Sequence, residues 1–172
     1  MQVVRYAAGA WGVGELWFDG AVPVWHELPT VARAHPPEGV ARPPTITLAG
    51  PDAHDRGNCV PEVARLVGRY FGGERVSFDG IRLDLDWCSP FQRRVADVLR
   101  AVPYGETVTY GELAALAGHP NAQRAAGTFC AQNRLPLLLP CHRVVAAGGI
   151  GSYGTLGGEY KRRLLELEHV VL

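Results

Sequence analysis

Residues 135–145 read Leu-Pro-Leu-Leu-Leu-Pro-Cys-His-Arg-Val-Val. The two prolines fix φ and prevent a helix or a strand ladder from continuing, so we expect a rigid, extended segment between them. The segment then places Cys141 directly before His142 and Arg143. Neighbouring cations or a general base lower the pKa of a thiol and make it nucleophilic, so this pattern predicts a reactive cysteine. A buried structural cysteine beside a surface histidine is the alternative, because free cysteines are often buried.

Two helices are expected upstream of this segment, and each begins with a capping box. Ser89 and Gln92 form the first box, and apolar residues at helical spacing follow it. Thr109 and Glu112 form the second box, and Gly118 ends that shorter helix. The start of both helices is therefore predicted from local hydrogen-bonding chemistry alone.

A third helix is expected over residues 122–132, capped by Asn121. With the second helix and the glycine-containing turn before it, this makes a helix-turn-helix pattern, which is typical of DNA-binding domains and is also a common packing unit. The third helix is rich in alanine, and Arg124 projects among the small residues. Small side chains permit close approach to a groove and helix N-termini attract phosphate, although an alanine-rich helix also packs tightly on a neighbour.

The N-terminal half predicts a small antiparallel sheet. Residues 2–26 contain three β-prone runs, and Asp19-Gly20 is a strong hairpin signal. Residues 30–56 contain five prolines and are expected to form an irregular connection. Three histidines of this region are expected to be exposed to solvent: His26, His35 and His54.

One helix is expected in the same half, over residues 61–71, with Asn58 as a possible cap and glycines at its end. A short hairpin, or one strand with an extended linker, is expected over residues 76–85 around Asp79-Gly80. We find no catalytic cluster among the first 87 residues, so they predict a scaffold or supporting domain.

The composition is ordinary for a water-soluble protein. Of 172 residues, 47% are hydrophobic and 20% are charged. No run of about 18 apolar residues and no signal-peptide pattern is present, so we expect a cytoplasmic protein with no membrane partner. The cysteines show no zinc-like spacing, so we predict neither a disulfide framework nor a metal site, and no cofactor. They are Cys59, Cys88, Cys130 and Cys141.

Charge is distributed unevenly along a chain whose formal net charge is zero. Residues 1–87 contain 8 arginines and 11 acidic residues, whereas residues 88–172 contain 9 basic and 6 acidic residues, giving −3 and +3. The half with the sequence motifs is therefore the basic half. This asymmetry favours a polyanionic partner, and a solvated charged surface is the alternative.

The run Pro140-Cys141-His142-Arg143-Val144 resembles the O6-alkylguanine-DNA alkyltransferase family, as do several residues around it. Asn133 and Arg124 precede this run, and Tyr153 and a helix containing Glu168 follow it. The resemblance is strong from about Ser89 to Glu168, but over the first 87 residues it is one of length and layout only. It implies irreversible, stoichiometric transfer of the alkyl group from O6-alkylguanine, and from O4-alkylthymine, in duplex DNA to the protein's own cysteine.

The resemblance also implies a role for each catalytic residue. Cys141 would be the nucleophile and permanent acceptor, and His142 would take its proton through a water molecule. Glu168 would orient His142 and stabilise its charge. Tyr110 would donate its phenolic proton toward the leaving purine.

The implied DNA contacts come from the helix-turn-helix, which family members place in the minor groove. Arg124 would fill the space left by a flipped nucleotide, with Ala125 and Ala126 beside it. Asn133 would hold the turn between the third helix and the cysteine segment. The guanine pocket would be lined by Cys130, Val144, Tyr153 and Gly154.

This sequence departs from the family pattern at two positions near the thiol. Arg134 follows Asn133, where many members have proline, and Cys130 stands where a larger apolar residue is common. The small Cys130 and Gly154 side chains lead us to expect a pocket that admits benzyl and other bulky adducts. Residues 1–58 contain no cysteine, so the zinc site of some family members is not expected.

Two other classes of protein remain as alternatives. A non-catalytic lesion-binding protein of the alkyltransferase-like group would lack the reactive cysteine, which is present here. A thiol hydrolase using Cys141, His142 and Glu168 would turn over, but adjacent cysteine and histidine suit a triad poorly.

The expected architecture is α/β, of the α+β kind, with two domains. Residues 1–87 would form a ribonuclease-H-like antiparallel sheet with a helix. Residues 88–172 would form a mainly helical, winged-helix-like domain that contains the helix-turn-helix and the thiol. We expect a monomer that binds double-stranded DNA containing O6-alkylguanine, with cooperative binding left open.

Overall fold

A computed structural model describes residues 1–31, 45–48 and 62–171. The chain divides into two compact units, Met1–Asp84 and Leu85–Leu172. Of the residues singled out above, His35, His54, Asn58 and Cys59 lie outside the described ranges. Among the described residues, no helix combines the length and apolar character needed to cross a membrane.

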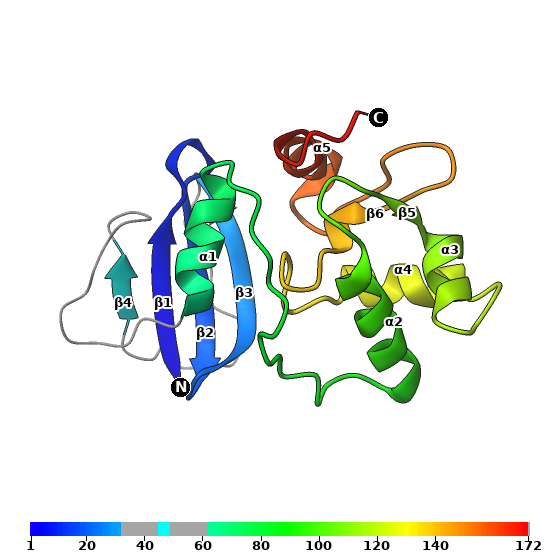
Figure 1. The fold of residues 1–172 in the computed structure, drawn as a ribbon, viewed down its shortest axis with the longest axis horizontal. Coiled ribbons are helices and arrows are strands. Elements are labelled where there is room, and N and C mark those ends of the chain that lie inside the picture. Colours follow the sequence, from blue (N-terminus) through cyan, green and yellow to red (C-terminus); the bar gives the residue numbers. More distant parts are fainter. Residues whose placement is uncertain (32–44, 49–61, 172) are drawn as a thin grey trace. The chain divides into compact units, whose positions relative to one another are not determined.

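The first unit is built on a four-stranded sheet in the order β3-β2-β1-β4 (Figure 1). Strands β1 (Gln2–Ala7), β2 (Val13–Asp19) and β3 (Val22–Thr30) pair antiparallel, as predicted, and the short helix η1 (Gly9–Trp11) joins the first two. β4 (Thr45–Leu48) pairs parallel with β1, so the prediction of an irregular connection was wrong for these four residues. Their partner is distant in sequence, and proline content does not reveal such pairing.

Helix α1 (Glu62–Phe71) lies across one face of this sheet (Figure 1). The Phe71 ring stacks on Tyr6 of β1 at a centroid distance of 6.2 Å and meets Trp11 at 5.3 Å. The helix ends as predicted, because Gly73 adopts a φ of 87° and its amide bonds the carbonyl of Tyr70. The aromatic contacts fix the helix on the sheet.

His26 was expected at the surface, and this expectation was wrong. The side chain is 3% exposed, and its Nε2 lies 2.7 Å from the hydroxyl of Tyr6. Tyr6 belongs to β1 and His26 to β3, so the tyrosine must reach across β2. Gly14 permits this, because a Cβ at that position would lie 2.3 Å from the Tyr6 hydroxyl. The contact depends on a glycine in a third strand, and no local pattern around His26 indicates it.

The hairpin or strand expected over residues 76–85 is also absent, since the structure shows turns but no strand between residues 72 and 87. The Ser77 hydroxyl donates to Asp79 Oδ2 at 2.7 Å and accepts from the Asp79 amide at 3.0 Å. These local bonds close a turn and occupy the groups that a strand would direct outward.

The second unit contains the predicted helices. α2 (Pro90–Ala101) and α3 (Tyr110–Leu116) each begin with the expected capping box, in which side chain and backbone bond reciprocally. α4 (Gln123–Ala131) follows α3, and α5 (Gly157–Leu167) ends the unit. Two short strands, β5 (Val108–Thr109) and β6 (Val144–Val145), pair parallel and tie the start of α3 to the residues after the thiol.

Asn121 does not cap α4. Its φ of 72° places it in the left-handed region, and Ala122 occupies the N-cap position without a side-chain hydrogen bond. The turn after α3 already uses Gly118, whose φ is 81°, and the Ala122 amide donates to the carbonyl of His119. Asparagine tolerates the left-handed conformation better than most residues, and the tight turn between the two helices uses that property instead of its capping ability.

The segment between Pro136 and Pro140 is a tight turn and not the extended piece that we expected. Leu137 adopts a φ of 70°, and the Leu139 amide donates to the carbonyl of Leu135 at 2.8 Å. The chain then enters the short helix η2 (Cys141–Arg143). The prolines restrict their own φ and the residues before them, but they leave Leu137 free to reverse the chain direction.

Candidate active site around Cys141

The thiol of Cys141 lies at the start of η2 and is nearly covered, with 5% of the residue exposed. The side-chain amide of Asn133 donates to the Cys141 sulfur at 3.1 Å and to the carbonyl of Leu139 at 2.8 Å. The Asn133 oxygen accepts from the Leu135 amide at 2.9 Å. One side chain therefore joins the end of α4, the turn at Leu137 and the sulfur.

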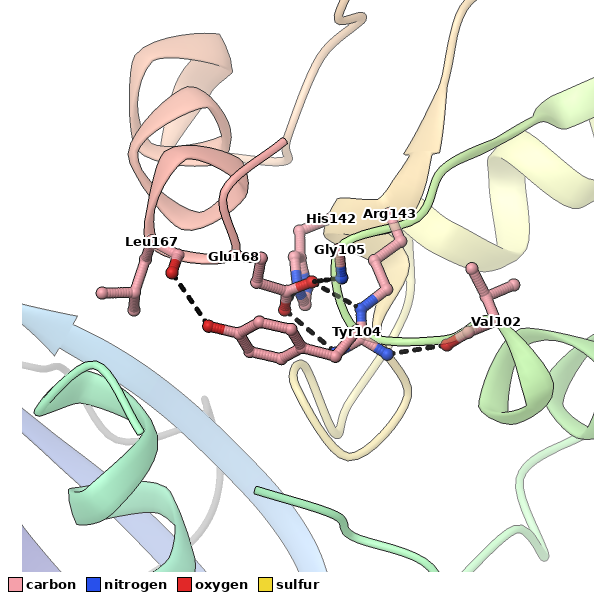
Figure 2. A network of polar contacts seen from close by, with 7 residues as sticks. All are labelled: Val102, Tyr104, Gly105, His142, Arg143, Leu167 and Glu168. Carbon is pink, nitrogen blue, oxygen red and sulfur yellow. Dashed lines mark hydrogen bonds and ion pairs between the residues drawn. The ribbon is translucent and has the colours of Figure 1, made fainter. Parts of the chain in front are cut away.

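A network of polar contacts surrounds the buried carboxylate of Glu168 (Figure 2). Glu168, at the end of α5, is 1% exposed, and its Oε1 lies 2.7 Å from His142 Nε2. Arg143 donates to both carboxylate oxygens, at 2.9 Å from Nε and 3.0 Å from Nη2. The Gly105 amide donates to Oε2 at 3.1 Å. The carboxylate is thus held by donors from two separate segments of the unit.

The Arg143 guanidinium makes further contacts within this network. Its Nη1 donates to the carbonyl of Val102 at 2.7 Å, and its guanidinium lies 5.9 Å from the ring centre of Tyr104. The Tyr104 hydroxyl in turn donates to the carbonyl of Leu167 (Figure 2). The Cys141-His142-Arg143 pattern offers Arg143 as a cation that lowers the thiol pKa, but its donors are directed to Glu168 and to backbone. These contacts give Arg143 a structural role.

The environment sets the charge states of the acid and the base. Burial opposes ionisation of Glu168, but hydrogen bonds and charge from His142 and Arg143 hold its pKa well below the ordinary value. Burial lowers the pKa of His142, with Glu168 acting in the opposite direction. A neutral imidazole has one donor and one acceptor nitrogen, so a proton on Nε2, directed at Glu168, leaves Nδ1 as a base.

Burial raises the pKa of the Cys141 thiol above its ordinary value, which contradicts the lowered value expected from its neighbours. The Asn133 hydrogen bond, Tyr153 and the charge of Lys161 act in the opposite direction. The resting sulfur is therefore held as a thiol, and a base must remove its proton during the reaction.

Lys161 is a site residue that sequence reasoning missed. The residue is fully buried, and its ammonium donates to the carbonyls of Val144 and Ser152. Burial lowers the pKa of this ammonium, and the nearby cysteines oppose that change. The helical spacing could have indicated that Lys161 is buried, because it shares a helical face with three residues that are all buried: Leu164, Leu165 and Glu168.

A small hollow opens next to the sulfur, with a total empty volume of about 270 Å³ that includes open solvent. Its lining includes three of the predicted pocket residues, Cys130, Tyr153 and Gly154, together with Tyr110 and Cys141. Val144, also predicted to line the pocket, is fully buried in β6 and is not part of this lining. Three lining residues were not predicted: Gly127, Ala131 and Ser152.

Tyr110 begins α3 and is partly buried at the hollow. Burial, followed by the nearby Cys130 and Cys141, raises the pKa of its phenol to about 12. A Cβ at Gly127 would lie 3.8 Å from the tyrosine ring, so α4 approaches α3 closely at this point. Tyr110 consequently stays protonated at neutral pH and can act as a hydrogen-bond donor.

The outer face of α4 presents Arg124 and Ala125 to solvent. Ala126 was predicted to face DNA, but it is fully buried, so its side chain cannot contact a partner. Thr128 donates its hydroxyl to the carbonyl of Arg124 at 3.0 Å, which turns that hydroxyl toward the helix backbone. Within the described ranges, no group of three or more histidine, cysteine or acidic residues is placed to hold a metal ion.

Comparisons with known proteins find relatives of this chain. The family model described as "6-O-methylguanine DNA methyltransferase, DNA binding domain" matches residues 90–170. The chain is 46% identical over 105 residues to a methylated-DNA–protein-cysteine methyltransferase of Methanopyrus kandleri, covering 60% of this chain and 76% of that protein. It is 48% identical over 103 residues to the protein of that name from Mycolicibacterium paratuberculosis, covering 59% and 61%.

Solved structures extend the similarity to both units. The crystal structure of Mycobacterium tuberculosis OGT in complex with DNA has a TM-score of 0.74 and 33% identity, covering 98% of this chain and 93% of that one. The O6-methylguanine methyltransferase of the same organism has a TM-score of 0.71 and 32% identity, covering 96% and 92%. An O6-methylguanine-DNA methyltransferase from Pyrococcus kodakaraensis, 24% identical, shares the fold with a TM-score of 0.67, covering 98% and 99%.

Proposed function

This chain belongs to the methylated-DNA–protein-cysteine methyltransferase family, and we propose that Cys141 is the residue that accepts the alkyl group, once per molecule. The substrate is O6-alkylguanine in duplex DNA, with O4-alkylthymine as a second lesion. The observation that carries the proposal is the arrangement of buried Cys141, His142 and Glu168 with the half-buried Asn133, beside a hollow that Tyr110 lines. It provides a nucleophile, a base and a donor for the leaving group.

The chemistry is a displacement at the alkyl carbon. The thiol proton passes to the Nδ1 of His142 through a water molecule, while Glu168 stabilises the imidazolium that forms. The sulfur–carbon bond forms as the bond between carbon and O6 breaks, and the electron pair stays on the purine. The Tyr110 hydroxyl, kept protonated by its raised pKa, donates toward that developing negative charge. The product is a thioether and, once the purine anion has taken up a proton in place of the one that left the thiol, an unmodified guanine.

The lesion must leave the base stack to reach the sulfur, because a base inside a duplex is not accessible to a covered thiol. We assign α4 to the minor groove, with Arg124 filling the space of the flipped nucleotide. The exposure of Arg124 and Ala125 supports this assignment. The charge excess of residues 88–172 has the sign that a DNA partner requires.

The protein acts as a monomer in the cytoplasm in this proposal. Sedimentation equilibrium with and without DNA tests the assembly state. A stable dimer in the absence of DNA would contradict it.

The deciding experiment is intact-protein mass spectrometry after incubation with a duplex that contains one O6-methylguanine. Wild type should gain about 14 Da, one methylene, and stop at one per molecule, as expected for a covalent acceptor with no release step. Cys141→Ser should gain nothing. Cys88→Ser is the matched control, because Cys88 is also buried in the second unit but does not line the hollow.

The same experiment separates the alternatives. A lesion-binding protein without transfer would retain the duplex and gain no mass. A thiol hydrolase would release product beyond one equivalent of protein and keep its original mass.

A further inference from the structure

Trp87 lies two residues before Ser89, the cap of α2, and contacts the segment that supports the thiol. Its ring stacks on Phe129 of α4 at a centroid distance of 5.7 Å, with 7° between the planes. The Arg134 guanidinium lies 5.2 Å from the centre of the Trp87 ring. Trp87 therefore contacts the last turn of α4 and the residue that follows Asn133.

Phe129 and the backbone next to Trp87 are themselves held in place. Phe129 is fully buried, and the Cys88 amide next to Trp87 bonds the carbonyl of Leu85 at 2.9 Å. Arg134 is exposed at the surface, so without the tryptophan its side chain would have water as its surroundings. The indole gives this arginine a fixed position on a rigid support.

Asn133 precedes Arg134 and makes the contacts that define the thiol environment. Its amide donates to the Cys141 sulfur and to Leu139, and its oxygen accepts from Leu135. Residues on both sides of Asn133 must keep their backbone positions for all three bonds to form together. The stack on Trp87 restrains the C-terminal side at Arg134, and the Phe129 contact restrains the preceding helix.

We propose that Trp87 and Arg134 are positioning residues, which hold Asn133 against the Cys141 sulfur and so set the reactivity of the thiol. The inference rests on the proposed role of Cys141 as acceptor. It assigns Arg134 a function inside the protein, distinct from contact with a phosphate. Removing either partner of the stack loosens Asn133 and weakens the hydrogen bond that favours the thiolate.

The test is the pH dependence of Cys141 alkylation by iodoacetamide, followed by peptide mass spectrometry, because this reagent needs no DNA. Trp87→Ala and Arg134→Gln should shift the midpoint of the pH profile upward and lower the rate constant about two- to five-fold, the size of an exposed cation–π contact. Trp87→Phe should retain most of the wild-type rate. The other groups around the sulfur stay unchanged in every variant: Tyr110, Cys130, His142, Tyr153 and Lys161.

Arg162→Ala is the matched control, since Arg162 is an exposed arginine of the same unit whose ion pair to Glu159, at 3.8 Å, is long and lies at the surface. It should leave the iodoacetamide profile unchanged. Methyl transfer from an O6-methylguanine duplex is measured in parallel for each variant. Arg134 is exposed, so Arg134→Gln is expected to fold even if Trp87→Ala does not.

The outcomes distinguish a failure of the proposed function from a failure of the positioning role of Arg134. A wild type that accepts no methyl group contradicts the proposed function itself. A wild type that accepts it, with an Arg134→Gln variant that weakens DNA binding but keeps the iodoacetamide profile, overturns the positioning role and leaves Arg134 as a phosphate contact.

Discussion

Replacing Glu168 with glutamine should strongly destabilise the second unit. The carboxylate is 1% exposed and accepts hydrogen bonds from His142, Arg143 and Gly105. Glutamine has the same shape, but it carries no charge and turns an amide group toward donors. The guanidinium of Arg143, whose side chain is 10% exposed, then lacks its counter-charge.

Breaking a buried ion pair by removing one partner costs about 3–5 kcal/mol, which sets the expected loss in the free energy of unfolding. For a unit of this size a loss of 3 kcal/mol corresponds to a fall in Tm of at least about 12 °C. Urea denaturation followed by far-ultraviolet circular dichroism measures the loss. Glu166→Gln, two residues earlier on the exposed side of α5, should change stability by less than about 0.5 kcal/mol.

A double-mutant cycle isolates the pair. Arg143→Met removes the uncompensated charge, so Glu168→Gln with Arg143→Met should cost clearly less than the sum of the two single variants. Two results would refute the reasoning: a loss below about 1 kcal/mol for Glu168→Gln, or additive losses in the double variant.

Three further predictions follow from the site. The pKa values of Glu168 and His142 in the folded protein both lie below their values in the unfolded chain, so the unfolded state takes up protons first as pH falls. The free energy of unfolding, measured by urea titration, should therefore fall as pH drops from about 7 to about 4. Constant stability over that range would contradict the buried network. Tyr110→Phe should slow methyl transfer about 100-fold, the usual effect of losing a positioned acid, while gel-shift affinity for the lesion duplex stays unchanged. Cys130→Met should narrow the hollow and lower the ratio of the transfer rate with O6-benzylguanine to the rate with O6-methylguanine. Cys130→Ser, of similar size, should keep the wild-type ratio of these two rates. Equal rate ratios in the two variants would exclude Cys130 as a determinant of adduct size.

Structural features that are determined by residues close together in the sequence could be predicted. The capping boxes at Ser89 and Thr109 need only residues three positions apart, and both are present as expected. The hairpin at Asp19-Gly20 is equally local, because the turn residues and the alternating strands determine it together. Local hydrogen-bonding chemistry and side-chain periodicity are sufficient in these cases.

Several of the errors occurred where distant residues decide the outcome. His26 is buried because Tyr6 reaches it across Gly14, and β4 exists because its partner is β1. Asn121 is compatible both with a helix cap and with a left-handed turn, and the spacing of α3 and α4 selects the turn. Propensity ranks the local choices, but packing makes the final selection.

The candidate site shows the same division. The sequence motif indicated Cys141, His142 and Glu168, but the lowered thiol pKa that it predicts is wrong. Burial decides the sign of the shift, and burial depends on α5, whose Lys161 and Glu168 both point inward. A lysine at a buried helical position is the one signal that pattern analysis could have used.

The raised thiol pKa has a chemical consequence for Cys141 in its proposed role as an acceptor that works once. A permanently ionised cysteine would react with any small electrophile and be consumed without repairing DNA. Here burial keeps Cys141 protonated, while a lowered pKa keeps His142 neutral and able to take the proton. Lys161 and Asn133 favour the thiolate once it forms. The thiolate is therefore expected to form mainly when an alkylated base fills the hollow and the proton moves to His142, so that the single alkylation is reserved for the lesion.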